Sequence, residues 1–201
     1  MELSLKVGAT FDADFLKVGR NRHGTAFGTM VDVINNSTQY LSDADLSAIA
    51  RYLKSLPPAV DGNQPIYAYD GSIDLRGIRA GDIGATVFFD RCEACHGQDG
   101  RGRASILPAL AGNPVVLDNN PVSLINIVLN GSSRLVVEGA PDIYRMTPFR
   151  GVLTDAEVAG VVTFIRSVWG NRAGSITPSQ VAAVGASTDR SSDRVTILRM
   201  R

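Results

Sequence analysis

The sequence has little cysteine, little histidine and no net charge. Its 201 residues include 2 Cys and 2 His, and 20 basic side chains balance 20 acidic ones. A chain without excess charge of either sign lacks a dominant attraction to nucleic acid or to an anionic membrane, and we predict no nucleic-acid partner. No apolar run approaches the ~18 residues of a membrane-spanning helix, so no transmembrane span is predicted. Residues 1–17 also lack the apolar stretch of a secretory signal.

The two cysteines stand together in the run Cys92-Glu93-Ala94-Cys95-His96. A C-x-x-C-H run is typical of covalent attachment of a c-type haem. The two thiols can add to the two vinyl groups of one porphyrin, and the histidine that follows is then placed beneath the iron. The run therefore predicts one covalent haem c, held by Cys92 and Cys95, with His96 as an axial ligand.

Other uses of two cysteines fit the chain less well. A structural zinc site needs four ligands, whereas the only histidine outside the run is His23. A thioredoxin-like redox pair usually accompanies a βαβ pattern, and the residues around Cys92 do not alternate like a strand. A chance match is the remaining alternative, and the downstream sequence disfavours it.

Two segments of the chain share one helix design. The later one is predicted to run from Thr154 to Trp169, because Thr154 and Glu157 have the spacing of a capping box and Gly170 can end the helix. The earlier one opens at residues 41–45 and stops before Pro57. The identical pairs in a gapless alignment are Leu41 and Leu153, Asp43 and Asp155, Ala44 and Ala156, and Ser55 and Ser167. These identities favour an internal repeat over two unrelated amphipathic helices.

The repeat implies parts of two similar domains. Its offset of 112 residues would place a counterpart of Cys92 about 20 residues before Met1. We therefore expect residues 1–58 to be a truncated half-domain that has no attachment motif. Its uncovered apolar helix face predicts poor folding or non-native docking.

The rest of the chain divides into three predicted parts. Residues 59–78 are expected to form a linker, residues 79–173 a complete domain, and residues 174–201 a polar tail. From Arg172 onward the chain is expected to be mostly disordered. Within the complete domain we predict a first helix over residues 82–91 with Ile83, Val87 and Phe88 facing inward, and a short helix over residues 121–130 that ends at Gly131.

Several motifs in the complete domain resemble class I cytochrome c. They are His96-Gly97, Gly100, Gly102, and the run from Pro108 to Pro114. The run Met146-Thr147-Pro148-Phe149 and the helix after it are similar to the third haem domain of triple-haem cytochrome c subunits of bacterial membrane-bound dehydrogenases. Residues 37–57 resemble the second haem domain of those subunits. The resemblance implies an all-α fold: a class I cytochrome c helical fold around covalent haem, preceded by a partial second cytochrome c domain.

The resemblance also implies roles for single residues. Met146 matches the distal iron ligand opposite His96, and a thioether in this position stabilises ferrous iron and raises the potential. Pro108 matches the proline whose carbonyl accepts a hydrogen bond from the other nitrogen of the proximal histidine. Leu110 would pack on the porphyrin. Met30 matches the distal ligand of the second haem, for which this chain has no attachment motif.

With both axial positions filled, the iron has no open site for a substrate, so we predict one-electron transfer and not catalysis. The resemblance implies a dehydrogenase catalytic subunit as the electron donor and a quinone or another cytochrome as the acceptor. It also implies a location in the periplasm, where the chain could associate with the outer face of the inner membrane. One alternative is a peroxidase-like haem enzyme, which needs a distal acid–base residue. The other is a freestanding soluble cytochrome, which the N-terminal half-domain disfavours.

Overall fold

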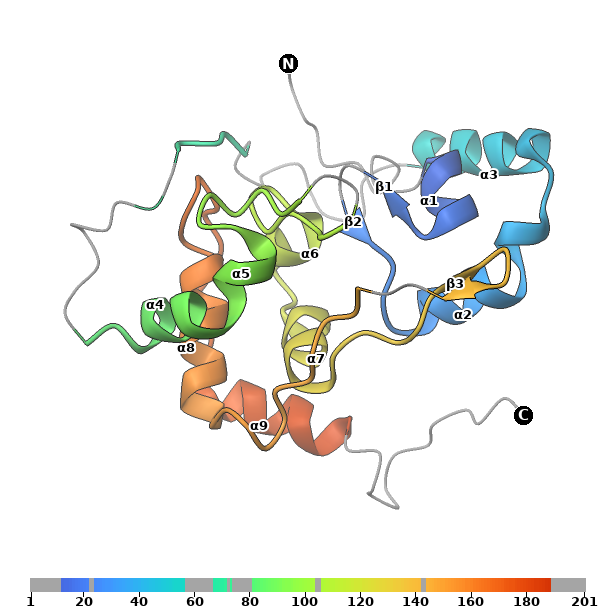
Figure 1. The fold of residues 1–201 in the computed structure, drawn as a ribbon. Helices are drawn as coiled ribbons and strands as arrows, with labels where there is room; N and C mark the ends of the chain where they lie inside the picture. The colour runs from blue at the N-terminus through green and yellow to red at the C-terminus, as the bar shows by residue number, and fades with distance from the viewer. Residues whose placement is uncertain are drawn as a thin grey trace.

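The computed structural model describes residues 12–21, 24–56, 67–71, 73, 81–103, 106–141 and 144–188. In chain order the helices are α1 (Ala13–Val18), α2 (Thr29–Asn36), α3 (Asp43–Ser55), α4 (Ile83–Val87), α5 (Glu93–His96), α6 (Pro114–Leu117), α7 (Val122–Asn130), α8 (Asp155–Ile165) and α9 (Pro178–Ser187). Two short antiparallel pairs join β1 (Arg20–Asn21) to β2 (Gly24–Thr25) and β3 (Val136–Val137) to β4 (Ala140–Pro141). These parts are mainly helical (Figure 1), which confirms the predicted all-α class.

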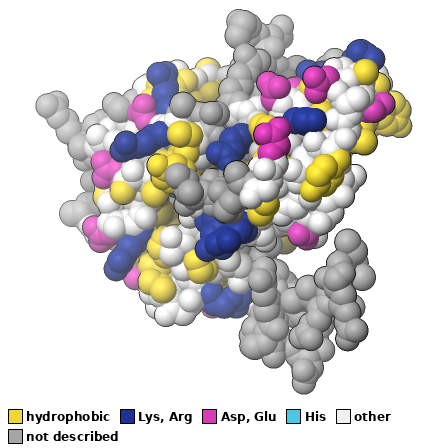
Figure 2. Space-filling view, turned by 45° about the vertical axis from the view of Figure 1, so that its right-hand side comes forward, with side chains coloured by type: hydrophobic (Ala, Val, Ile, Leu, Met, Phe, Trp, Pro, Cys, Tyr) yellow, Lys and Arg dark blue, Asp and Glu magenta, His cyan; other side chains and the backbone are white. Residues whose placement is uncertain are grey.

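The surface carries charges of both signs. On the face drawn in Figure 2, Lys and Arg side chains occur together with Asp and Glu side chains and with apolar patches. Within the described segments, no helix is both long enough and apolar enough to cross a membrane. Most of the predicted linker and the end of the predicted tail lie outside the described residues.

Helices α4 and α8 are in close backbone contact where Gly84 of α4 meets Gly160 of α8. A Cβ atom built on Gly84 would lie 2.3 Å from the carbonyl oxygen of Gly160, closer than real side chains come, so only glycine permits this approach. Phe88 follows α4 and is fully buried, with its ring centroid 5.5 Å from that of Phe164 and 5.3 Å from that of Trp169. A π-helical turn then leads into α5. The crossing thereby determines where the cysteine-containing helix begins.

The predicted inward face of the first helix in this domain is partly wrong. Val87 and Phe88 are buried, but Ile83 is 52% exposed. Gly84 makes the close contact with α8, and its neighbour Ile83 lies at the edge of the crossing. The periodicity of the apolar residues could not reveal that a glycine provides the contact.

Helix α8 begins as predicted and ends earlier than predicted. Thr154 Oγ1 accepts a hydrogen bond from Glu157 N, and a Glu157 carboxylate oxygen accepts one from Thr154 N at 2.7 Å. This arrangement confirms the capping box. The helix stops at Ile165, and Trp169 adopts a φ of 57°. The turn lets the buried indole donate from Nε1 to the carbonyl oxygen of Gln98 at 2.9 Å, a bond that a continued helix would not allow.

Residues 172–188 include a helix, which contradicts the disorder expected from Arg172 onward. Helix α9 begins with a capping box formed by Thr177 and Gln180. Val181 and Val184 are buried where α9 packs against α7 and α8 (Figure 1). The expectation was wrong here because a good cap and two apolar side chains on one face outweigh a polar average composition.

Residues 12–56 are also folded. Leu16 of α1 packs with Leu46 and Ala50 of α3, and all three are buried. The expectation of poor folding is therefore not met over these residues. Helix α3 is only partly covered by its neighbours, however, since the side chain of Tyr52 is 64% exposed.

A loop of the predicted complete domain (residues 79–173, called the second domain from here on) inserts into residues 12–56, the first segment. Leu135 is buried in a cluster with Phe15, Ala26, Val31 and Ile34. Asn35 donates from Nδ2 to the carbonyl oxygen of Arg134 at 2.9 Å and accepts at Oδ1 from Val136 N at 2.8 Å. Gln39 likewise donates to the carbonyl oxygen of Val136 and accepts from Glu138 N. Figure 1 shows the resulting contact, with β3 beside α2.

Candidate haem-binding site

Two cavities with a partly shared lining lie in the second domain, and the larger one also reaches the first segment. The larger encloses about 770 Å³, counting the part that opens to solvent, and the smaller about 460 Å³. Cys92, His96 and Met146 line both of them, as do Ile127 and Phe149. Known small-molecule and cofactor pockets are lined mostly by apolar side chains. The apolar lining of these cavities is therefore suited to a mainly apolar ligand.

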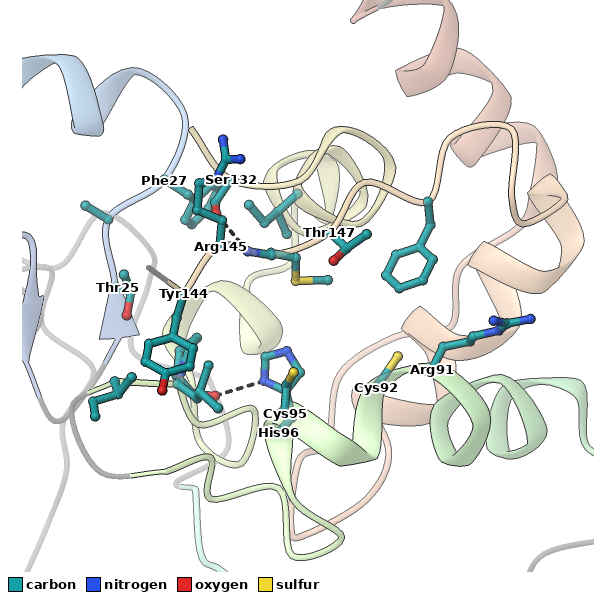
Figure 3. A pocket seen from close by; sticks show the side chains of 17 residues that line it. Thr25, Phe27, Arg91, Cys92, Cys95, His96, Ser132, Tyr144, Arg145 and Thr147 are labelled. Atoms are coloured by element: carbon teal, nitrogen blue, oxygen red, sulfur yellow. Dashed lines mark hydrogen bonds between the residues drawn. The ribbon is translucent and has the colours of Figure 1, made fainter. Parts of the chain in front are cut away.

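His96 projects from the end of α5 into the larger cavity (Figure 3). Its Nδ1 lies 3.0 Å from the carbonyl oxygen of Pro108. Because a carbonyl can only accept, Nδ1 must carry the hydrogen, and Nε2 is left with a free lone pair. Burial lowers the pKa of His96, while the hydrogen bond to Pro108 acts in the opposite direction. A neutral imidazole with one free nitrogen is the form that binds a metal.

The two cysteines lie beside His96 on the same wall (Figure 3). Neither is in a disulfide; Cys92 is partly buried and Cys95 is exposed. Burial raises the pKa of Cys92 to about 11, and the nearby Cys95 adds to this effect. The Cys92 thiol is therefore protonated at neutral pH when nothing is bound to it. Within the described segments, no group of three or more His, Cys, Asp or Glu side chains could hold a metal ion.

Met146 reaches the cavities from a distant part of the chain, on a segment held by Ser132. Met146 N donates to Ser132 Oγ at 2.9 Å, and Ser132 N donates to the Met146 carbonyl oxygen at 3.2 Å. The neighbouring Gly131 has a φ of 68°, and a Cβ there would lie 2.5 Å from the Met146 carbonyl oxygen. The end of α7 and the Met146 segment are thus in close backbone contact.

Pro108 and Leu110 line the larger and the smaller cavity, respectively. Gly100 accepts backbone hydrogen bonds from Leu110 N and Ala111 N, and Asn171 Nδ2 donates to the Leu110 carbonyl oxygen at 3.2 Å. The structure therefore places all six predicted site residues in the lining of these two cavities, which share five residues. Their roles toward a haem stay predictions.

The site also includes residues that the sequence gave no reason to choose. Thr25, Ala26 and Phe27, from the first segment, line the larger cavity, and Figure 3 shows Thr25 and Phe27 at its edge. Met30 packs instead between the two apolar clusters of the first segment. His23 lies outside the described residues.

The residues present fit a covalent haem. Two thiols and a neutral imidazole share one wall of a mostly apolar cavity, and a thioether also borders that cavity. A C-x-x-C-H run on a short helix is the attachment pattern expected for a c-type haem.

Known proteins agree with this interpretation. Residues 82–169 match the family model of cytochrome c. Over 171 residues the chain is 44% identical to the cytochrome c subunit of an alcohol dehydrogenase (quinone) from Gluconacetobacter polyoxogenes, a match that covers 83% of this chain and 36% of that protein. Over 175 residues it is 44% identical to a gluconate 2-dehydrogenase cytochrome c subunit from Pantoea cypripedii, covering 85% of this chain and 39% of that protein.

A more distant relative is the fructose dehydrogenase cytochrome subunit of Gluconobacter japonicus. It is 29% identical over 205 residues, which is 90% of this chain and 41% of that protein. The chain thus spans well under half the length of these relatives. The predicted resemblance is confirmed. Residues 82–169 form a cytochrome c domain, and the chain is homologous to the cytochrome c subunits of dehydrogenases.

Proposed function

We propose that this chain transfers single electrons through one covalent haem c ligated by His96 and Met146. The observation that carries the proposal is the His96–Pro108 hydrogen bond, which leaves Nε2 of a neutral imidazole facing a cavity that Met146 also lines. The homology to cytochrome subunits supports the same function. When bound, haem supplies a one-electron couple between ferric and ferrous iron.

The chain's own residues would divide the work of holding the group. Cys92 and Cys95 would form the two thioether bonds, and His96 Nε2 and the Met146 sulfur would bind the iron. The Pro108 carbonyl fixes the orientation of the imidazole through the 3.0 Å bond to Nδ1. Such bonds hold the ligand in place and tune its basicity.

The apolar lining has a further effect. Leu110, Leu124, Val161 and Ile165 line the smaller cavity. An apolar environment penalises charge, so it would favour the reduced state, which carries one positive charge fewer. Together with a thioether ligand, it would raise the reduction potential.

The peroxidase-like alternative is less well supported. It needs an acid–base group on the side of the iron opposite His96. Among the described residues that line the two cavities, none is a carboxylate, and the single histidine is His96.

The partners and location are part of the proposal. The relatives are named as subunits of alcohol, gluconate and fructose dehydrogenases, so the proposed donor is a dehydrogenase catalytic subunit. The proposed acceptor is a quinone or another cytochrome. The proposed location is the periplasm, with the outer face of the inner membrane as the place where such a complex would assemble.

The ligand assignment can be tested by absorption spectroscopy of the haem-loaded protein. The ferric protein should show the weak long-wavelength band of sulfur-to-iron charge transfer, and Met146→Ala should abolish it. Met30→Ala is the matched control, because Met30 packs in the first segment and not in the cavities. A band that survives in Met146→Ala, or disappears in Met30→Ala, would reject the assignment.

A further inference from the structure

We propose that Arg150 is a positioning residue for Met146, and that helix α9 holds Met146 in place through Arg150. Helix α9 lies beyond residues 82–169, the part that matches cytochrome c. The inference rests on the proposed ligation of the iron by Met146. It assigns a role to an arginine that is exposed and that the redox chemistry does not use.

The side chain of Arg150 connects the Met146 segment to two helices. Nε donates to Asn130 Oδ1 at 2.9 Å, at the last residue of α7. Nη1 donates to the carbonyl oxygen of Gly185 at 3.1 Å, and Nη2 donates to Thr188 Oγ1 at 2.9 Å. Gly185 lies in the last turn of α9, and Thr188 directly follows the helix. One guanidinium therefore joins the ends of α7 and α9.

Thr188 is itself held firmly. Its hydroxyl donates to the carbonyl oxygen of Val184 at 2.7 Å and accepts from Asn130 Nδ2 at 3.0 Å as well as from Arg150. Helix α9, which ends directly before Thr188, is held by Val181, which is fully buried. The Thr188 hydroxyl has one donor and two acceptor sites, and all three form hydrogen bonds here. Thr188 is therefore a well-fixed partner for Arg150.

The short segment between Met146 and Arg150 lies along α7. Phe149 N donates to the carbonyl oxygen of Val128 at 3.1 Å, and Arg150 N to that of Leu129 at 2.9 Å. Met146 and Ser132 exchange two further bonds. For the Met146 sulfur to move far from the cavity, this segment has to shift along α7 or lift from it. The Arg150 side chain opposes that movement at the far end of the segment.

The effect of Arg150 on Met146 should be measurable when another ligand competes for the iron. Imidazole can bind ferric iron only after Met146 has left, so its apparent affinity reports how readily Met146 departs. The net contribution of one intramolecular hydrogen bond to stability is modest. We therefore expect Arg150→Ala to raise the imidazole affinity of the ferric protein roughly two- to tenfold. Thr188→Val, which removes one of the three contacts, should raise it less.

The experiment is an imidazole titration of the haem-loaded ferric protein, followed through the loss of the sulfur-to-iron band. Val158→Ala is the matched control, because it removes a fully buried side chain from α8 and leaves the contacts between Arg150 and α9 in place. The proposal predicts that Arg150→Ala and Thr188→Val raise the affinity more than Val158→Ala does. Equal affinities in the three variants, or an unchanged affinity in Arg150→Ala, would overturn it.

The same titration separates this inference from the proposed function. If the wild-type protein has no sulfur-to-iron band, the ligation by Met146 is wrong, and so is the positioning role of Arg150. If the band is present and depends on Met146, but the imidazole affinity does not respond to changes at Arg150 or Thr188, only the positioning role of Arg150 is wrong.

Discussion

Helices α3 and α8 begin alike and end in very different surroundings. Each opens with a hydroxyl side chain as its N-cap, Ser42 in α3 and Thr154 in α8. Helix α3 buries only Leu46 and Ala50. Helix α8 buries six residues: Val158, Ala159, Val161, Val162, Phe164 and Ile165. The N-cap and the spacing of the apolar residues specify a helix in both places. They do not determine how many of its side chains are buried.

The aligned positions explain the difference. Gly160 of α8, where α4 crosses, corresponds to Ala48 of α3, which is exposed. Helix α8 also forms part of the cavity wall through Val161 and Ile165, whereas α3 packs mainly against α1. The comparison indicates that residues 12–56 are held by a smaller core and are the less stable region.

The largest expected effect comes from removing a core side chain in α3. Leu46→Ala should destabilise residues 12–56 by about 2–5 kcal/mol, the usual cost of a buried Leu→Ala change. Amide hydrogen exchange of the haem-loaded protein should become faster in α3 and stay slow in α8. Val158→Ala, at the aligned and equally buried position of α8, is the matched control and should accelerate exchange in α8. If Leu46→Ala accelerates both helices equally, the two regions unfold as one unit and the comparison fails.

A smaller effect is expected at the helix crossing. Gly84→Ala places a Cβ 2.3 Å from the Gly160 carbonyl oxygen, and overpacking of this kind costs about 1–3 kcal/mol. The thermal midpoint should fall accordingly. The exposed Ala48→Ser change in α3 should stay within about 0.5 kcal/mol. A Gly84→Ala protein as stable as Ala48→Ser would show that the two helix backbones do not touch.

The smallest effect concerns the capping box of α8. Hydrogen bonds from the backbone and side chain of Thr154 lower the pKa of Glu157. A carboxyl whose folded-state pKa is lowered stabilises the fold above its unfolded pKa, and this contribution is lost as the pH falls through the folded pKa. Glu157→Gln should therefore flatten the dependence of the thermal midpoint on pH in the acid range, from the ordinary pKa of a glutamate downward. Asp155→Asn, which removes the same charge from the same turn, serves as the control; an equal flattening there would point to charge alone.

The sequence predicted those features that are formed by residues close to one another along the chain. The C-x-x-C-H run, the Thr154–Glu157 box and the helix end at Gly131 all depend on neighbouring residues, and the structure contains both helix features. The end of α8 was missed because the Trp169–Gln98 hydrogen bond joins distant residues. The contribution of Phe27 to the cavity was missed for the same reason, since it depends on how the first segment packs on the second domain.

Helix α9 could have been found. Thr177 and Gln180 have the spacing of a capping box, Pro178 occupies the first helical position, and Val181 and Val184 share one face. The polar composition of the whole tail obscured this short pattern. The Arg150 contacts, in contrast, have no signal in the sequence, because they join α7, α9 and the Met146 segment only after folding.

We expect residues 82–169 to hold one covalent haem and residues 12–56 to hold none. The most direct measurement is the intact mass of the chain produced together with haem-attachment machinery, followed by peptide mapping. The mass should increase by one haem, located on the peptide that contains Cys92 and Cys95. Cys92→Ala and Cys95→Ala should each leave at most one thioether bond. A chain that carries no haem, or two, would contradict the proposed haem attachment.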